Sequence, residues 1–407
     1  MKYLVSAYSV NPYKGSEDNI GWNWLIQYSK NVRVDDEVYL ITKKYNEEDT
    51  LKGMKEKKIK NVKLIIVDVP KYLNWFREKY SIFHHMYYIL WQYYAYKWVK
   101  KSKIEFDVIH HVTMNDYRII GKMYKFKKAY TILGPVGGAQ VTPKNLKCYE
   151  TNKIQAQFRK LVNLTCDYNL FYKNALRKFD KIYAINEETQ KQIENITKKK
   201  CEILPELAIR EEYKYLDIKK EKNDMINILF VGRLIGKKGV FLLIDIAKNL
   251  PENFRYILKI YGDGKEKKKV KKKIKEYELD KKIILMGARK FEEIQQAYKD
   301  ADMFIMPSLR ETSGNVLLEA MAHKLPIIGI DMSFEHQLKE IDCGIFVNPN
   351  LEKEKIIENF CNAIVQLSTD NDYRKFLGEN GYRYVNEELT WEKKNKIIYR
   401  EKTNEKK

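Results

Sequence analysis

The residues best suited to bind a charged ligand lie between Glu311 and Glu319. The small residues Thr312 to Gly314 lead into an apolar, helix-forming run, so free N–H groups and the positive end of a helix dipole are expected there, where a pyrophosphate fits. Glu311 lies at this phosphate end and can accept hydrogen bonds from sugar hydroxyls. Glu319 falls within the apolar run, where a carboxylate must face water or be held by partners such as a ribose diol. Each glutamate also has an ordinary structural explanation. Glu311 could interact with the positive end of the helix dipole, and Glu319 could be an exposed helix residue.

A second group of chemically capable residues follows the apolar run Ile226 to Val231. Arg233 offers a fork of donors and Lys238 a point charge, and both suit a diphosphate. Gly232 precedes the arginine in this loop. These cations lie in the same half of the chain as the two glutamates, which favours a site for a nucleoside diphosphate.

Two N-terminal loops carry weaker candidates. The loop Asn11 to Gly21 contains Gly15 and Ser16 just after the first apolar run. A second loop, Gly134 to Gln140, contains three glycines and follows another apolar run, so its backbone can approach a ligand closely.

Two adjacent histidines, His110 and His111, end the run that begins at Asp107. Because neighbouring side chains of a strand point to opposite faces, only one of them can face a ligand. We expect His111 to face it and His110 to pack in the core.

Parallel strands alternating with helices are expected to position these residues, since short β-rich apolar runs alternate with helix-period segments. Ligands of such open sheets bind where strands end, which is where the candidate loops lie. The expected strands are Lys2 to Ser6, Val38 to Thr42, Val62 to Val67, Val108 to His110, Ala129 to Leu133, Ile226 to Val231, Tyr256 to Tyr261, Ile283 to Met286, Met303 to Met306 and Pro326 to Ile330.

Two domains are expected, because 407 residues exceed what one hydrophobic core usually supports. The proline and charged stretch between Pro205 and Asp224 interrupts the alternation. We therefore predict a Rossmann-like domain over residues 1–205 and a second one over residues 206–384, with a C-terminal helix over about 385–407 that packs back on the first.

The C-terminal half resembles the retaining glycosyltransferases of family 4. The resemblance rests on E-x7-E at Glu311 to Glu319, on GRL and KG at Gly232 to Gly239, and on Tyr261 to Gly264, Met286-Gly287 and Tyr298 to Ser308. It implies the α/β GT-B architecture, in which two doubly wound Rossmann-like domains face each other across a cleft.

The same resemblance implies roles for the site residues. Arg233 and Lys238 would hold the diphosphate, Glu311 the donor sugar and Glu319 the ribose. The implied catalytic residues are Glu311, His111, Arg233 and Lys238. The implied donor-binding residues are Gly15, Ser16, Gly232, Arg233, Lys238, Gly287, Glu311, Ser313, Gly314, Asn315, Val316 and Glu319.

The chain departs from the family pattern at two turns. Lys324 replaces a usual glycine, and Ser333-Phe334 replaces a usual Gly-Gly. In the more loosely matching N-terminal half, His110 and His111 are adjacent where the family spaces two histidines by one residue. The loop Gly134 to Gln140 resembles that of a branch associated with bacterial surface polysaccharides.

A formal charge of +21 predicts attraction to something anionic, although a lysine-rich surface can also simply be solvated. Residues 71–103 mix aromatic and basic side chains, which is typical of interfacial helices on anionic membranes; packing of an aromatic helix on the sheet is the alternative. The sequence shows no signal peptide, no CxxC pair and no nucleic-acid-binding signature. We expect a cytoplasmic protein, with possible peripheral contact at the inner face of the cell membrane and no nucleic-acid partner.

These features predict a retaining glycosyltransferase that moves a sugar from a UDP- or GDP-sugar to a lipid-linked or polysaccharide acceptor in bacterial surface glycan synthesis, such as capsule, exopolysaccharide or O-antigen. No cofactor is expected. Asp300 and Asp302 resemble a DxD metal motif but close a helix and open a strand, so no metal is expected either. A nucleotide-sugar epimerase of the same architecture is the alternative, followed by a nucleic-acid-binding or anionic-membrane-binding protein.

Overall fold

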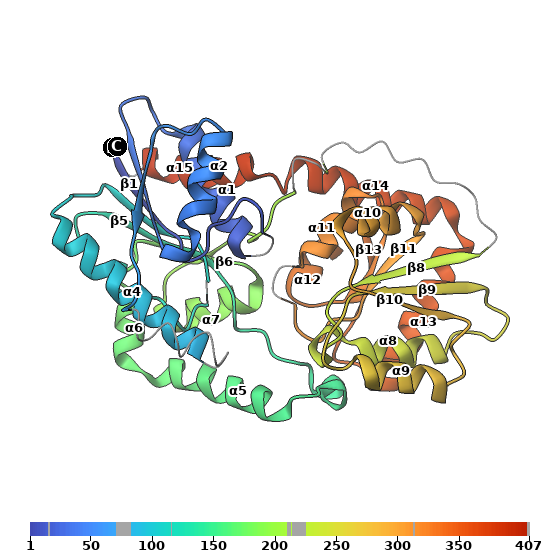
Figure 1. Cartoon of the computed structure of the whole chain (residues 1–407). Helices are drawn as coiled ribbons and strands as arrows, with labels where there is room; N and C mark the ends of the chain where they lie inside the picture. Colours follow the sequence, from blue (N-terminus) through green and yellow to red (C-terminus); the bar gives the residue numbers. More distant parts are fainter. Residues whose placement is uncertain are drawn as a thin grey trace. The chain divides into compact units, whose positions relative to one another are not determined.

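The computed structural model describes residues 1–14, 17–70, 83–114, 116–209, 213, 225–311 and 314–404. Strands and helices alternate along these ranges (Figure 1). The strands are β1 (Lys2–Ser6), β2 (Glu37–Thr42), β3 (Val62–Ile66), β4 (Val108–His111), β5 (Tyr130–Val136), β6 (Lys181–Ala184), β7 (Glu202–Ile203), β8 (Ile226–Val231), β9 (Tyr256–Tyr261), β10 (Ile283–Gly287), β11 (Met303–Met306), β12 (Ile327–Ile330) and β13 (Gly344–Val347).

Helices connect the strands. The α-helices are α1 (Glu17–Asn31), α2 (Glu47–Glu56), α4 (Phe83–Ser102), α5 (Lys153–Tyr168), α6 (Leu170–Leu176), α7 (Glu187–Thr197), α8 (Val240–Lys248), α9 (Lys267–Glu276), α10 (Phe291–Asp300), α11 (Asn315–Ala322), α12 (Ser333–Lys339), α13 (Lys353–Thr369), α14 (Asn371–Glu387) and α15 (Trp391–Asn404). The short 3-10 turns are η1 (Lys44–Asn46), η2 (Met123–Lys125), η3 (Lys144–Tyr149) and η5 (Gly236–Lys238).

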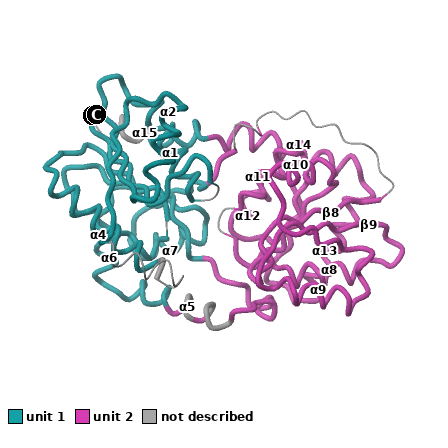
Figure 2. The backbone as a smooth tube through the Cα atoms, viewed as in Figure 1, with its two compact units in different colours: residues 1–139, 162–206, 391–407 teal, residues 140–161, 207–390 magenta. Residues whose placement is uncertain are grey.

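The chain forms two compact units (Figure 2). Unit 1 contains residues 1–139, 162–206 and 391–407, and unit 2 contains residues 140–161 and 207–390. The sequence-based division assigns residues 140–161 to the first domain, whereas their contacts group them with unit 2. The C-terminal helix α15 packs on α1 within unit 1, where the rings of Trp24 and Trp391 meet edge to face at 5.5 Å.

Unit 1 is built on a seven-stranded sheet in the order β3-β2-β1-β4-β5-β6-β7, with parallel pairing throughout. Helix α4 covers one face of it, because Tyr87, Tyr88 and Trp91 pack with β-strand residues such as Ile109. On the opposite face, His110 lies against the ring of Trp24 from α1. The change of winding direction between β1 and β4 makes the carboxyl ends of these strands the expected ligand position of this unit.

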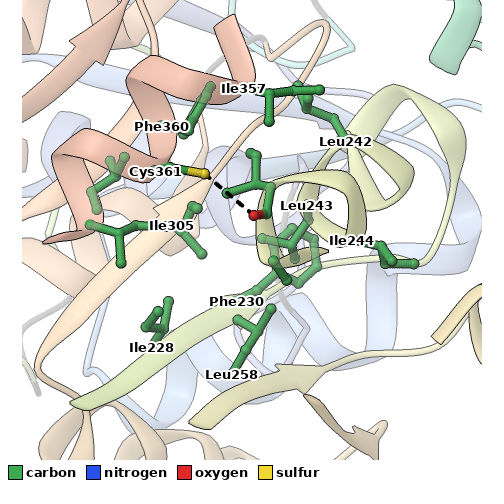
Figure 3. Close-up of a cluster of buried hydrophobic side chains, with 14 of the residues drawn as sticks. Ile228, Phe230, Leu242, Leu243, Ile244, Leu258, Ile305, Ile357, Phe360 and Cys361 are labelled. Carbon is green, nitrogen blue, oxygen red and sulfur yellow. Dashed lines mark hydrogen bonds between the residues drawn. The ribbon is translucent and has the colours of Figure 1, made fainter. Parts of the chain in front are cut away.

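Unit 2 has a six-stranded parallel sheet in the order β10-β9-β8-β11-β12-β13. Its core is a cluster of buried aliphatic and aromatic side chains between the sheet and α8, α9 and α13 (Figure 3). In this cluster the thiol of Cys361 donates to the carbonyl oxygen of Ile246 at 3.4 Å. Helices α10 and α11 lie on the other face of the sheet (Figure 1). Strands buried on both faces account for the continuous apolar runs of the sequence.

Candidate functional site

The C-terminal candidate residues gather at the point where the sheet of unit 2 reverses its winding. Strands β8 and β11 are neighbours there, although β9 and β10 intervene in the sequence. The loop after β8 carries Arg233 and Lys238, and the loop after β11 carries Glu311. Open parallel sheets bind ligands at this position, because the loops after the two central strands diverge from it.

The two loops are fastened to each other through their backbones. The N–H of Leu309 donates to the carbonyl oxygen of Lys237 at 2.9 Å. Gly239 has a φ of 70°, and a Cβ there would lie 1.7 Å from the carbonyl oxygen of Pro307. Only glycine therefore allows the loop after β8 to approach the loop after β11 this closely.

An ion pair joins the side chains of the two loops. The ammonium of Lys238 pairs with the carboxylate of Glu311, and their side chains are only 16% and 11% exposed. The hydroxyl of Ser308 donates to the same carboxylate oxygen at 3.4 Å. The lysine predicted to bind phosphate and the glutamate predicted to bind sugar are thus in direct contact.

Further cations surround this pair. Loss of hydration lowers the pKa of Lys237 to about 8; Glu311 opposes that change, while the positive charges of Lys238, Arg233 and Arg310 reinforce it. Arg233 itself is exposed. Arg310 was not among the residues predicted from the sequence, although it is adjacent to Glu311, which was. The loops therefore present a concentrated positive charge that suits a diphosphate.

Helix α11 begins beside this cluster. Its N-cap residue, Gly314, has a left-handed φ of 58°, and Asn315 and Val316 form the first turn. The predicted Ser313 and its neighbour Thr312 lie outside the described residues. The first-turn N–H groups of a helix are donors without partners in the helix itself, which makes this end suitable for an anion.

Glu319 is half-buried on the same helix. The hydroxyl of Tyr298, from α10, lies 3.1 Å from the Glu319 carboxylate and 3.3 Å from the carbonyl oxygen of Val316. Burial raises the pKa of Tyr298 well above its usual value, and the negative charge of Glu319 adds to the effect. The carboxylate is therefore held by a neutral hydrogen-bond donor, and the interpretation of Glu319 as an ordinary exposed helix residue is wrong. The sequence contained this partner within the stretch Tyr298 to Ser308, but nothing there indicated its target.

The two turns at which the chain departs from the family pattern keep the backbone conformation that glycine usually adopts. Lys324 and Ser333, which stand where glycine is usual, both have a left-handed φ of 56°. Lys324 follows α11, and Ser333 begins α12 after β12. Gly287, at the end of β10, also has a positive φ, of 74°. The turns around the site therefore have left-handed geometry even where the sequence supplies a larger residue.

In unit 1, the two histidines of β4 point to opposite faces, as predicted. His110 lies between the hydroxyl of Tyr28 at 2.9 Å and the carbonyl oxygen of Gly134 at 2.8 Å. It is fully buried, as expected for a core residue.

His111, which we expected to face a ligand, is buried as well and has protein partners at both ring nitrogens. Its Nδ1 lies 3.0 Å from the hydroxyl of Ser6, and its Nε2 lies 2.6 Å from the hydroxyl of Tyr88. Burial lowers the pKa of His111 to about 4, so the ring is neutral near neutral pH. Ser6, Gln92 and His111 line a small cavity.

The remaining predicted residues of unit 1, Gly15 and Ser16, lie outside the described residues. The carboxylate of Glu17, directly after them, is described. It accepts a hydrogen bond from the N–H of Met114 at 2.9 Å, and burial raises its pKa. This bond ties the start of α1 to the loop after β4, the two places where a ligand of unit 1 is expected.

The structure describes only part of the aromatic and basic segment, residues 71–103, for which membrane contact and packing on the sheet were both expected. Residues 71–82 lie outside the described part of the chain. Within α4, Tyr87, Tyr88 and Trp91 are buried against the sheet, which favours packing for these three rings. Among the helices in the described ranges, none is long and apolar enough to cross a membrane.

Comparison with known proteins adds a family match. Residues 213–384 match the family model described as glycosyl transferases group 1. An uncharacterized glycosyltransferase of Methanocaldococcus jannaschii is 30% identical over 228 residues, which are 55% of this chain and 59% of that protein. The putative colanic acid biosynthesis glycosyltransferase WcaL of Escherichia coli is 29% identical over 154 residues, 36% of this chain and 37% of its own length. The chain thus spans less than two thirds of either relative.

A solved structure matches over the whole length. HepE of Anabaena, in complex with UDP, superposes with a TM-score of 0.63 at 15% identity, covering 99% of this chain and 100% of that one. At this identity the likeness shows the fold. The matches support a glycosyltransferase: the chain has the two-domain α/β fold of the GT-B enzymes, and residues 213–384 match the group 1 glycosyl transferases.

Proposed function

We propose that the chain is a retaining glycosyltransferase of the family 4 type, which transfers a sugar from a nucleotide diphosphate sugar to a glycan acceptor. The observation that carries the proposal is the contact between Lys238 and Glu311 at the switch point of unit 2. A cation for a diphosphate and an acceptor of sugar hydrogen bonds are needed next to each other, because the diphosphate and the sugar of the donor are themselves adjacent.

The donor binds in the proposed site as follows. Its diphosphate takes the hydrogen bonds of Arg233 and Lys238 and faces the N-terminus of α11 at Gly314. Binding therefore draws Lys238 away from Glu311, whose carboxylate turns to the hydroxyls of the sugar. Glu319 binds the ribose, with Tyr298 keeping the carboxylate in place. Gly232, Gly287, Ser313, Asn315 and Val316 complete the proposed donor contacts, together with Gly15 and Ser16.

The reaction breaks the bond between the anomeric carbon of the sugar and the diphosphate oxygen. The acceptor hydroxyl oxygen forms a bond to the same carbon on the same face, and its proton leaves with the nucleoside diphosphate. Negative charge grows on the diphosphate as its bond breaks. Arg233, Lys238 and the N–H groups of α11 stabilise that charge, and such preset donors are usually the largest contribution to catalysis.

Unit 1 is the proposed acceptor side. Within the proposed division, residues 1–205 form the acceptor domain, residues 206–384 the donor domain, and the helix from about 385 returns to the first. His111 at the end of β4 is the proposed acceptor-side residue. As a neutral ring between two hydroxyl groups, it would act through hydrogen bonds rather than through charge.

The donor and acceptor classes are supported by the relatives. The complex of HepE with UDP supports a UDP-sugar, with a GDP-sugar as the second candidate. The name of WcaL, a colanic acid biosynthesis glycosyltransferase, supports an acceptor in bacterial surface glycan synthesis, either lipid-linked or a polysaccharide.

Peripheral contact with an anionic membrane on the cytoplasmic side is part of the proposal. At the junction of α5 and α6, Tyr168, Leu170 and Phe171 are 76%, 70% and 90% exposed, and Leu164 is 50% exposed. Lys173 and Lys178 follow in the same stretch. Apolar side chains that insert between lipids, next to lysines that meet anionic head groups, would bring the enzyme to a lipid-linked acceptor.

Product analysis tests the assignment. The purified protein is incubated with each UDP- and GDP-sugar, with and without lipid-linked glycan acceptors, and the products are identified by mass spectrometry and anomeric NMR. A glycosyltransferase lengthens an acceptor and releases the nucleoside diphosphate, with the anomeric configuration retained. Conversion of the donor to its epimer without any acceptor would instead establish the alternative enzyme class.

A further inference from the structure

Residues 140–151, here called the docking segment, follow the sheet of unit 1 in the sequence but pack on unit 2 (Figure 2). Leu146 and Tyr149 of its turn η3 are buried in the core cluster of unit 2. The hydroxyl of Tyr149 donates to Asp245 at 2.8 Å, and the amide of Asn145 donates to the carbonyl oxygen of Leu351, also at 2.8 Å. The docking segment is therefore held on unit 2 by buried side chains and by hydrogen bonds.

The end of the docking segment contacts both loops of the donor site. The carboxylate of Glu150 pairs with the guanidinium of Arg310 at 3.2 Å, with side chains 8% and 16% exposed. The hydroxyl of Thr142 donates to the same carboxylate. On the other loop, a Cβ at Gly236 would lie 2.7 Å from the hydroxyl oxygen of Thr151, so these residues touch. Gly236 lies two residues before Lys238 in the first loop, and Arg310 lies directly before Glu311 in the second.

We propose that Glu150 is a positioning residue of the donor site: it holds the guanidinium of Arg310 away from Glu311 and thereby keeps Glu311 available to Lys238 and to the donor sugar. The inference rests on the proposed function, because it concerns the same site. Without Glu150, the guanidinium lies unpaired next to Glu311, the following residue of the chain, and competes with Lys238 for that carboxylate.

Two electrostatic effects oppose each other when Glu150 is removed. The loss of a carboxylate makes the site more positive, which favours a diphosphate. The loss of the pair also leaves a largely buried guanidinium without compensation, and a charge in that position must move to another acceptor. Because both side chains are less than one fifth exposed, the second effect is the larger one, and Arg310 takes Glu311 away from the donor sugar.

The test is the release of nucleoside diphosphate from each UDP- and GDP-sugar, with calorimetric titration of UDP and GDP beside it, at a temperature where circular dichroism shows every variant to be folded. The variants are Glu150→Gln, Arg310→Gln and the double variant. Glu379→Gln is the matched control, because Glu379 also pairs with a cation of unit 2, Lys324 at 2.7 Å, but at the other end of α11. We expect Glu150→Gln to slow donor cleavage about tenfold, because Arg310 then occupies Glu311, while nucleotide affinity does not fall. The control should change either quantity less than about twofold.

The double variant measures whether the effects of Glu150→Gln and Arg310→Gln are coupled. If Glu150 acts through Arg310, the double variant cleaves the donor no more slowly than the slower single variant. An unchanged cleavage rate in Glu150→Gln, even with a lowered melting temperature, shows that the pair is only structural and overturns the positioning role. Faster cleavage overturns it as well, since Glu150 would then only weaken the positive potential. If the wild type cleaves no donor, the proposed function itself fails, and this inference fails with it.

Discussion

The ammonium of Lys238 and the carboxylate of Glu311, 73 positions apart in the chain, form an ion pair between the loops that follow β8 and β11. The backbone bond from Leu309 to Lys237 and the close approach of Gly239 to Pro307 hold these loops together. The proposed donor site is thus preformed in unit 2, and each member of the pair would exchange its partner for one part of the donor.

Lys238→Met should weaken UDP binding by roughly 10- to 100-fold, because hydrogen bonds to charged groups contribute about 1.5–3 kcal/mol. Calorimetric titration at low and moderate salt measures the loss. Lys339→Met is the control, since Lys339 also pairs with a carboxylate of unit 2, Asp331 at 2.7 Å, but lies on α12. Equal affinities of the two variants would show that Lys238 does not touch the diphosphate.

Glu311→Gln should separate nucleotide binding from sugar transfer. The change releases Lys238 from its partner, so UDP affinity stays the same or rises, while transfer falls by roughly 100-fold as the contact to the sugar is lost. Release of UDP from the donor gives the rate, and Glu276→Gln on the exposed side of α9 serves as the control. A variant that transfers sugar at the wild-type rate would remove Glu311 from the site.

Gly239→Ala and Gly287→Ala form a matched pair for the contact between the loops. Both glycines have a positive φ, 70° and 74°, but a Cβ at Gly287 meets nothing within 4 Å. Strain alone predicts a loss of about 1–2 kcal/mol in the free energy of unfolding for Gly287→Ala. The clash with Pro307 adds to it, so Gly239→Ala should lose roughly 3 kcal/mol or more. Urea unfolding measures both, and similar losses would contradict the close approach of the loops.

The stability of the protein should fall below neutral pH, partly through His111. Its folded pKa of about 4 lies below the ordinary value of 6.5, so the unfolded state binds the proton first as the pH falls. The contribution is complete above pH 6.5 and is lost progressively between about pH 6.5 and pH 4, to a total of about 3 kcal/mol. Urea unfolding at pH 7 and pH 5 should show a smaller difference for His111→Gln than for the wild type. His85→Gln, at an exposed histidine of α4, should behave as the wild type does.

Leu170→Ser combined with Phe171→Ser should reduce binding to anionic vesicles. Both side chains are largely exposed, so the change removes inserted apolar surface with little effect on the fold. Co-sedimentation with phosphatidylglycerol and phosphatidylcholine vesicles, at low and high salt, measures the binding. Val34→Ser, at a fully exposed apolar residue outside α5 and α6, is the control. Equal sedimentation of the two proteins would place any membrane contact elsewhere.

The fold could be predicted from the sequence because a strand buried on both faces is a continuous apolar run. Strands β1, β8, β9 and β11 begin and end at the predicted residues, and the other predicted strands differ by one to three residues at their ends. The left-handed conformations of Lys324 and Ser333 could not be predicted, since those residue types rarely adopt them.

The meeting of the loops that carry Arg233, Lys238 and Glu311 could also be predicted, because these residues follow strand ends on one edge of a parallel sheet. Their supporting contacts could not. The partner of Arg310 is Glu150, from a segment on the other side of the domain boundary predicted from the sequence, and no local pattern links the two. Tyr88 stood in an aromatic run that suited a membrane as well as a core, and only its packing shows that it contacts His111.

The central claim is that the loops after β8 and β11 bind and activate a nucleotide diphosphate sugar. The most direct measurement is the release of nucleoside diphosphate when the wild type and Arg233→Met are incubated with each UDP- and GDP-sugar. We predict that the wild type cleaves one donor and that Arg233→Met cleaves the same donor at least about tenfold more slowly, because a charge-assisted contact to the leaving group is lost. Cleavage of no donor by the wild type, or equal cleavage by both proteins, would contradict the account.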